Sequence, residues 1–179
     1  SNYFYPKAKI YTFEPLEDHF LKVKNKFSKI ENISVHNLAL GDEEGFIVFN
    51  KNKCGHVSSV LNISEDNKYY PKDDIKKIEV KITKLDSFFK DIHIPKSSLM
   101  KLDVQGFELE ALKGAKKLIQ KIDYIVIEAN LEKLYDKQPS FTEVNAFLND
   151  NGFEVCGMLD FNLGTKNKYI ELDILYKRV

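Results

Sequence analysis

Arginine is almost absent from this chain of 179 residues. Arg178 is the one arginine among 27 basic residues. The two-pronged contacts that a guanidinium group makes with phosphates and carboxylates are therefore nearly unavailable. Basic and acidic residues number 27 each, so no net charge attracts nucleic acid or an anionic membrane. The composition argues against a kinase, a nucleic-acid reader or an enzyme of phosphorylated sugars, and we expect neither nucleic acid nor membrane as a partner.

Cysteines and long apolar runs are also scarce. Cys54 and Cys156 stand in unrelated contexts, which predicts two free thiols in a reducing cytoplasm rather than a disulfide framework. No stretch approaches the roughly 20 apolar residues that cross a bilayer, and no signal peptide is visible. No His, Cys or carboxylate spacing is typical of a metal site, so no metal is expected. We expect one cytoplasmic domain over residues 1–179, because 43% hydrophobic residues suffice for a core.

Apolar residues follow helical spacing in some segments and strand-like alternation or short continuous runs in others. We expect strands at 9–13, 33–40, 45–49, 78–82, 98–103, 123–128, 153–159 and 169–176, and helices at 16–30, 109–118 with a break at Gly114, and 140–150. Residues 50–77 are polar and irregular, and they are interpreted as a loop. Strands that alternate with helices predict an α/β fold with a mostly parallel sheet, and the last two strands are expected to form an antiparallel pair.

Acidic residues follow four of the expected strands. Glu14, Asp42, Asp103 and Glu128 lie at or just after strand ends, where ligands bind in open α/β sheets. One such acid is as often a helix cap or a solvated turn, but four together predict a polar rim. An acid in the place of Glu14 can accept hydrogen bonds from ribose hydroxyls and would repel a 2′-phosphate, which disfavours NADP. Gly106 suits a tight exit from strand to helix.

Four segments in a fixed order carry a family resemblance. They are Tyr11-Thr-Phe-Glu-Pro15, Asn37-Leu-Ala-Leu-Gly-Asp42, Lys101-Leu-Asp-Val-Gln-Gly-Phe-Glu-Leu-Glu-Ala-Leu-Lys-Gly-Ala115 and Ile127-Glu128. In this order and at this spacing the chain resembles the FkbM-type methyltransferases, from about residue 9 to residue 160. The Asp-Val-x-Gly-x-Glu block is the most specific piece. The resemblance implies a Rossmann-like methyltransferase core, S-adenosylmethionine as cofactor, and O-methylation of a small molecule or glycan.

The resemblance also assigns residues to the cofactor. It implies Glu14 for the ribose, Asp42 near the adenine, and Asp103 and Gln105 beside the methionine end or the substrate. The family usually has glutamate in the place of Gln105, so we expect no role there that needs a negative charge.

Methyl transfer to a hydroxyl group also needs a base, because the acceptor must lose its proton. A positioned base contributes roughly 10²–10⁴-fold. Candidates are Asp103, Glu128 and His56, which lies in a loop expected to cover the acceptor. The alternative interpretation of His56 is an exposed loop histidine.

A glycine-rich loop is missing from the segment before Tyr11. In the family this loop follows a first strand that lies between the strands expected at 9–13 and 98–103. Tyr3–Pro6 resembles the tail of the helix that follows the loop. Each buried backbone group left unpaired costs about 1–3 kcal/mol, against a typical stability of 5–15 kcal/mol. The hypothesis is that the chain is part of a longer enzyme; otherwise the sheet closes up, or it borrows a strand from another copy as a homo-oligomer.

Two other classes of protein remain open. One is a methyltransferase-like module that has lost cofactor binding and acts as a scaffold, which the missing loop favours. The other is a nicotinamide-dependent oxidoreductase, which also uses a ribose-binding acid. The Asp-Val-x-Gly-x-Glu block is not part of that fingerprint, and this disfavours the oxidoreductase.

Overall fold

The computed structural model describes residues 7–179, so the expected helix tail at Tyr3–Pro6 lies outside the described residues. The strands are β1 (Ile10–Phe13), β2 (Ile33–His36), β3 (Ala39–Leu40), β4 (Gly45–Lys51), β5 (Lys76–Thr83), β6 (Leu99–Leu102), β7 (Tyr124–Asn130), β8 (Phe153–Leu163) and β9 (Tyr169–Arg178). The α-helices are α1 (Glu17–Lys26), α2 (Leu85–Phe88), α3 (Glu108–Lys113) and α4 (Phe141–Asp150). Short 3₁₀ turns are η1 (Gly55–Val57), η2 (Ile119–Lys121) and η3 (Thr165–Asn167).

The strands form three sheets rather than one. Their orders are β1-β2, β3-β5-β4 and β6-β7-β9-β8. Pairs β1–β2, β3–β5 and β6–β7 are parallel, whereas β4–β5, β7–β9 and β8–β9 are antiparallel. The fold is therefore mixed α/β instead of the mostly parallel sheet expected. The antiparallel pair at the C-terminus is confirmed.

The strand expected at 33–40 is split between two sheets. Asn37 lies between the parts, and its Nδ2 donates to the backbone oxygens of Glu14 and Pro15 at 2.9 Å each. β2 therefore pairs with β1, while β3 leaves to pair with β5. Helix α1 is also shorter than expected and ends at Lys26. The apolar spacing predicted the elements here but not their ends.

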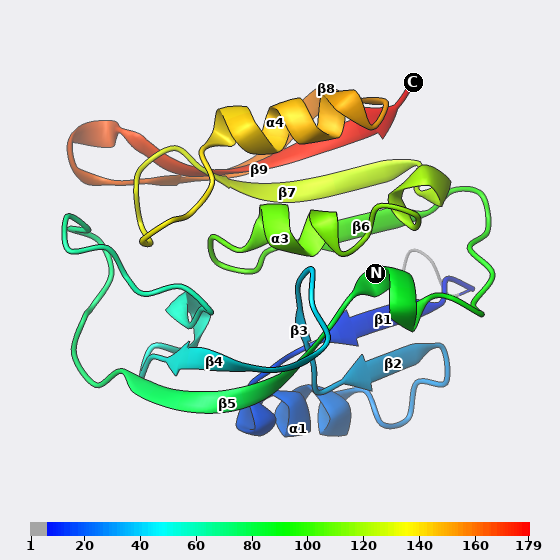
Figure 1. Ribbon diagram of the computed structural model, residues 1–179, viewed down its shortest axis with the longest axis horizontal. Coiled ribbons are helices and arrows are strands. Elements are labelled where there is room, and N and C mark those ends of the chain that lie inside the picture. The colour runs from blue at the N-terminus through cyan, green and yellow to red at the C-terminus, as the bar shows by residue number, and fades with distance from the viewer. Residues whose placement is uncertain (1–6) are drawn as a thin grey trace.

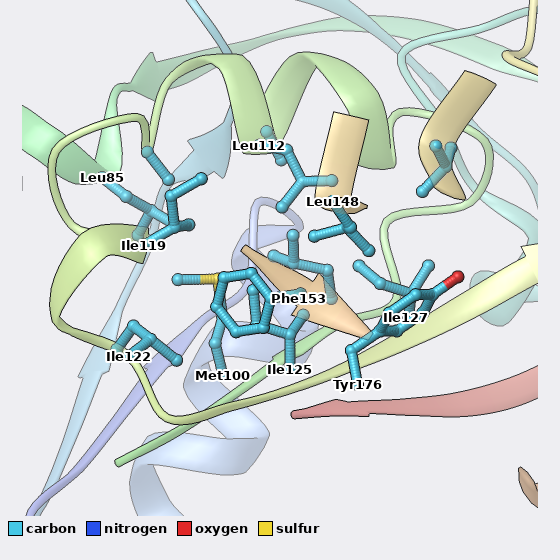
Figure 2. Close-up of a cluster of buried hydrophobic side chains, with 14 of the residues drawn as sticks. Leu85, Met100, Leu112, Ile119, Ile122, Ile125, Ile127, Leu148, Phe153 and Tyr176 are labelled. Carbon is cyan, nitrogen blue, oxygen red and sulfur yellow. The ribbon is translucent and has the colours of Figure 1, made fainter. Parts of the chain in front are cut away.

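The main core lies between one face of the four-stranded sheet and helices α3 and α4 (Figure 2). Leu112 from α3 and Leu148 from α4 are fully buried against Ile125 of β7 and Tyr176 of β9. Each such side chain stabilises the fold by roughly 1.5–3 kcal/mol. Consecutive buried residues in β7 confirm that this strand is covered on both faces.

Two local features fix the ends of the helices. Ser140 and Glu143 form a capping box at the start of α4, which their spacing of three residues in the sequence predicts. Helix α3 ends at Gly114, where a Cβ atom would lie 1.9 Å from the backbone oxygen of Gly41. Glycine therefore allows the end of α3 to pack on the turn after β3, and this contact explains the expected break.

Strands β1 and β6 lie in different sheets, in the lower and upper halves of Figure 1. Within residues 7–179 no ladder joins them, so the sheet has not closed up by direct pairing of these two strands. Aromatic contacts connect the halves instead. Phe13 of β1 packs edge-to-face on Phe88 at 4.9 Å between ring centroids, and Phe13 and Phe89 both pack against the main core.

Two further expectations concern the cysteines and membrane-spanning helices. Cys54 and Cys156 are free and exposed, as expected. Among the described residues, no helix has the length and apolar character needed to cross a membrane.

Candidate active site

The exit from β6 is a tight turn that a buried carboxyl group holds in place. Gln105 and Gly106 both have positive φ angles, 55° and 88°. Glu108 Oε1 accepts hydrogen bonds from the backbone nitrogens of Val104 at 3.1 Å and Gly106 at 3.2 Å. Burial raises the pKa of Glu108 to about 7. Glu108 therefore fixes the turn that positions Asp103 and Gln105.

Gly106 is required at this turn for two reasons. Its φ angle favours glycine, and a Cβ atom there would lie 2.9 Å from Cδ2 of Tyr135. The expectation of a close approach at Gly106 is confirmed. The Tyr135 ring packs against the turn because the glycine leaves it room.

Gln105 joins two carboxyl groups on neighbouring parallel strands. Asp103 directly follows β6, and Glu128 lies just past the last residue of β7 that pairs with β6, although β7 runs on to Asn130 rather than ending at 128 as expected. Its Nε2 donates to Glu128 Oε2 at 2.7 Å and to Asp103 Oδ1 at 3.0 Å. Its Oε1 accepts from the Tyr135 hydroxyl at 2.7 Å. This orientation of the amide is the favourable one, since only the NH₂ group can donate to carboxylates. An amide can therefore bridge two carboxyl groups here where a third carboxylate would be repelled.

Glu128 has an unusual electrostatic environment. Burial, together with the nearby Asp103 and Glu171 carboxyl groups, raises the pKa of Glu128 far above its ordinary value. Lys101 lies on the neighbouring strand, and its Nζ is 3.4 Å from Asp103 Oδ2 and 3.1 Å from Asp173 Oδ2. The shift favours the protonated form of Glu128, while Asp103 has a cationic partner.

Glu171 completes this group of acids, and sequence reasoning missed it. Its side chain accepts hydrogen bonds from the Tyr70 hydroxyl and, at 2.8 Å, from Asn162 Nδ2. We call Asp103, Glu128 and Glu171 the carboxyl cluster. Glu171 lies in an antiparallel strand, so the rule for the ends of parallel strands does not select it. The alternation of apolar and acidic residues from Ile170 to Ile174 in β9 was the available signal, because it places Glu171 and Asp173 on one face.

The loop between β4 and β5 is fixed by buried polar side chains. The backbone nitrogen of the buried Asn52 donates a hydrogen bond to Ser58 Oγ at 2.9 Å. Asn67 Nδ2 donates to the backbone oxygen of Leu134 at 2.9 Å. Ser59 Oγ donates to the backbone oxygen of Gln105 at 2.7 Å, which attaches the loop to the carboxyl cluster's turn. The loop expected at 50–77 is therefore an ordered wall of the site.

Glu14 directly follows β1 and is held mainly by its own turn. Its Oε1 accepts the backbone N–H of Leu16 at 2.8 Å, and its Oε2 lies 4.0 Å from Nδ1 of His19. Burial raises the pKa of Glu14, and the bond from Leu16 opposes that shift. His19 in turn fits against Gly55, where a Cβ atom would lie 2.1 Å from the imidazole ring. Through His19, Glu14 is thus linked to the same loop that Ser59 attaches to the turn after β6.

His56 and Asp42 lie apart from this network. His56 is exposed in η1, and Asp42 is exposed in the turn that packs against Gly114. Among the described contacts, neither side chain bonds to the carboxyl cluster. In residues 7–179 no three His, Cys, Asp or Glu side chains are placed to hold a metal ion. The structure therefore brings together Asp103, Gln105 and Glu128. Glu14 is linked to the β4–β5 loop through His19, and the side chains of Asp42 and His56 are not part of this hydrogen-bond network.

Three comparisons with known proteins bear on this arrangement. The family model for the Methyltransferase FkbM domain matches residues 1–155. Hexuronic acid methyltransferase AglP of Haloferax volcanii is 22% identical over 157 residues, covering 83% of this chain and 62% of that protein. 2-O-methyltransferase NoeI of Sinorhizobium fredii is 22% identical over 142 residues, covering 74% of this chain and 58% of that protein. The chain thus spans about three fifths of the length of these curated relatives.

A solved structure shares the fold. The crystal structure of methyltransferase FkbM from Methylobacillus flagellatus has a TM-score of 0.54 at 18% identity, over 95% of this chain and 36% of the solved chain. Because the family model covers most of the residues, including the turn after β6 and the end of β7, the chain belongs to the FkbM methyltransferase family.

Proposed function

We propose that this protein transfers a methyl group from S-adenosylmethionine to a hydroxyl group of a small molecule or glycan. The observation that carries the proposal is the bridge from Gln105 to Asp103 and Glu128, just past the end of the parallel ladder between β6 and β7. Ligands of open α/β folds bind at such ends. The curated relatives are named for methyl transfer to hexuronic acid and to a 2-O position, which supports an oxygen acceptor.

The side chains present fit the cofactor. Glu14 keeps Oε2 outside the bond to Leu16, so this oxygen can accept from a ribose hydroxyl. From the family pattern we retain Asp103 and Gln105 beside the methionine end or the substrate, where the methyl group meets its acceptor. We retain Asp42 near the adenine as a proposal from the family pattern. When bound, S-adenosylmethionine supplies an electrophilic methyl group on a sulfonium.

Asp103 is the base that we propose for the acceptor hydroxyl. Its carboxylate is held by Gln105 and Lys101, and its side chain is partly exposed, so an acceptor can reach it. The hydroxyl proton passes to the carboxylate of Asp103 as the oxygen gains the methyl group. Glu128 is less suited to this role at neutral pH because its raised pKa keeps it protonated. Glu128 instead holds Gln105, and His56 is the alternative base.

We also propose that a further strand completes the site between β1 and β6. Each of these strands has a ladder partner on one edge only among the described residues. In the family the first strand lies between them and carries the glycine-rich loop. A strand borrowed from a second copy is the alternative source, and the mass of the protein in solution distinguishes the two.

Product analysis tests the proposed function. The natural full-length protein is incubated with S-adenosylmethionine and a panel of methyl glycosides. We expect S-adenosylhomocysteine to form in amounts equal to the methylated glycoside, as measured by mass spectrometry. Absence of methylated product from every acceptor, with no binding of S-adenosylmethionine, would favour the non-catalytic scaffold.

A further inference from the structure

The side chain of Asn130 is a feature of the site to which the methyl-transfer scheme gives no role. Asn130 ends β7 and lies directly opposite Glu171 in the antiparallel ladder. Opposite residues share a face of the sheet, and this face also carries Glu128, two residues earlier on the same strand. Asn130 is 8% exposed, and within the described residues its buried Oδ1 has no hydrogen-bond partner. Because buried amide oxygens are almost always bonded, this oxygen is available to a donor on a ligand.

Glu171 beside it is held rigidly rather than free to turn away. It is 5% exposed, and both of its oxygens accept hydrogen bonds, from Tyr70 and Asn162. The Tyr70 ring in turn lies 5.9 Å from the Tyr135 ring, measured between centroids. A buried carboxyl group in a fixed position is screened only weakly from a ligand placed against it. We call Asn130, Glu171 and Tyr70 the acceptor wall.

The basic side chain that contacts the acids near the acceptor wall is already paired with two carboxylates. In the described part of the chain, Lys101 is the one basic side chain in contact with the acids of this face, and it is paired with Asp103 and Asp173. Arg178 lies at the far end of β9, where it donates to the backbone oxygens of Ile122 and Asn151. A carboxylate or phosphate on the acceptor would need such charged donors and would meet acids instead.

We infer that the acceptor wall selects a sugar ring that carries no negative charge and donates a hydroxyl hydrogen bond to Asn130. Uronates and phosphorylated sugars would be rejected by Glu171. The inference rests on the proposed function, since it names the class of acceptor for that same site. It goes beyond that function by assigning specificity to residues outside the Asp103–Gln105–Glu128 bridge.

Paired acceptors test the charge preference. Methyl glucoside, galactoside and mannoside, each with its uronate counterpart, are titrated into the natural full-length protein at neutral pH, with binding followed by calorimetry and ligand-observed NMR. We expect at least one neutral glycoside to bind roughly tenfold or more tightly than its uronate, because like charges at close range disfavour binding strongly. A uronate that binds as tightly as its neutral partner, or more tightly, overturns the inference.

Substitutions test whether the acceptor wall causes the preference for neutral over acidic sugars. Glu171→Gln is expected to bring the uronate to within about threefold of the neutral glycoside, because the like charge is removed. Asn130→Ala is expected to weaken the neutral glycoside by about tenfold through loss of one buried acceptor. Glu154→Gln is the matched control, since it removes an exposed carboxyl group on β8 and should keep the wild-type ratio. If Glu171→Gln remains folded, as judged by thermal unfolding, but keeps the wild-type ratio of affinities for neutral glycoside and uronate, the assignment to Glu171 is contradicted.

A parallel titration with S-adenosylmethionine separates this inference from the proposed function. Binding of neutral sugar without binding of the cofactor would contradict the methyltransferase proposal and leave the acceptor wall standing. Binding of the cofactor without binding of any neutral glycoside would contradict the wall alone. If the variants fail to fold, the ratio of the wild-type protein's affinities for neutral and acidic sugars still tests the inference.

Discussion

The strand ends of β6 and β7 differ from the strand end of β1 in how their polar side chains are held. Asp103 and Glu128 are joined across two strands by Gln105, which is itself bonded to Tyr135 and, through its backbone, to Ser59. Glu14 is bonded within its own turn, to Leu16. The first region thus forms a network between distant segments, whereas the second is a local arrangement.

Packing follows the same division. The four-stranded sheet is covered by α3 and α4 over the main core, whereas a hollow of about 360 Å³ runs along β1 and β2, beside Tyr11 and Ser34. This chain therefore holds the side of the site proposed for the acceptor in place by itself. The side proposed for the ribose depends more on what packs against β1. Substitutions in the two regions should therefore change different quantities.

The largest effect is expected from Asp103→Asn. Loss of the proposed base should lower kcat by about 10²–10⁴-fold, while the Kd for S-adenosylmethionine changes much less. Steady-state kinetics and calorimetry measure the two quantities. A variant that keeps kcat within tenfold of the wild-type value would show that Asp103 does not take the proton.

Gly106→Ala should break the turn that the network needs. The positive φ angle and the 2.9 Å approach to Tyr135 together lead us to expect a loss of about 2–4 kcal/mol in the free energy of unfolding. Gly157→Ala is the control, because a Cβ atom there has no neighbour within 4 Å. Urea denaturation compares them, and equal stability of the two variants would contradict the crowding at Gly106.

Glu108→Gln tests the structural role of Glu108 through the pH dependence of the free energy of unfolding. The folded pKa of Glu108 is raised from 4.5 to about 7, so its contribution to stability is present below pH 4.5 and is lost as pH rises through about 7. Relative to wild type, the stability of the variant should rise between those limits, to a gain of about 3 kcal/mol above pH 7. Urea denaturation across this range measures the difference, and a gap that is independent of pH would count against the shift.

Glu14→Gln tests the other region. Removing the charge should raise the Kd for S-adenosylmethionine by roughly tenfold, since one charged hydrogen bond is weakened, and leave kcat within about twofold. Glu17→Gln, on the exposed first turn of α1, is the matched control. A large fall in kcat with unchanged Kd would mean that the two regions are not divided as described.

His56→Ala should have the smallest effect. His56 is exposed in η1, so kcat/KM is expected to fall by no more than about threefold. The pH profile is the readout, because a catalytic histidine would contribute an ascending limb near its ordinary pKa of about 6.5. Loss of such a limb in the variant would make His56 the base in place of Asp103.

Local patterns in the sequence predicted much of this site. The positions of Glu14 and Asp103 directly after β1 and β6 follow from apolar runs, and the capping box at Ser140 follows from spacing alone. These features depend on residues close together in the chain. Gly106 is similar, since a glycine between a strand and a helix indicates a tight exit.

Other parts depend on contacts between distant segments and were not predictable in this way. Glu171 meets the site because β9 inserts antiparallel between β7 and β8, and Tyr70 reaches it because Asn67 fixes a loop against Leu134. Apolar periodicity gives a strand but not the neighbour it pairs with. For the same reason the segment 33–40 was expected as one strand, although its halves belong to different sheets.

Calorimetric titration with S-adenosylmethionine tests the central claim most directly. It is performed on the natural full-length protein and on this 179-residue chain. We predict saturable binding of one cofactor by the full-length protein and weaker binding by the chain, because β1 and β6 lack a strand between them among the described residues. The absence of binding by the full-length protein would contradict the assignment of these strand ends to a methyltransferase site.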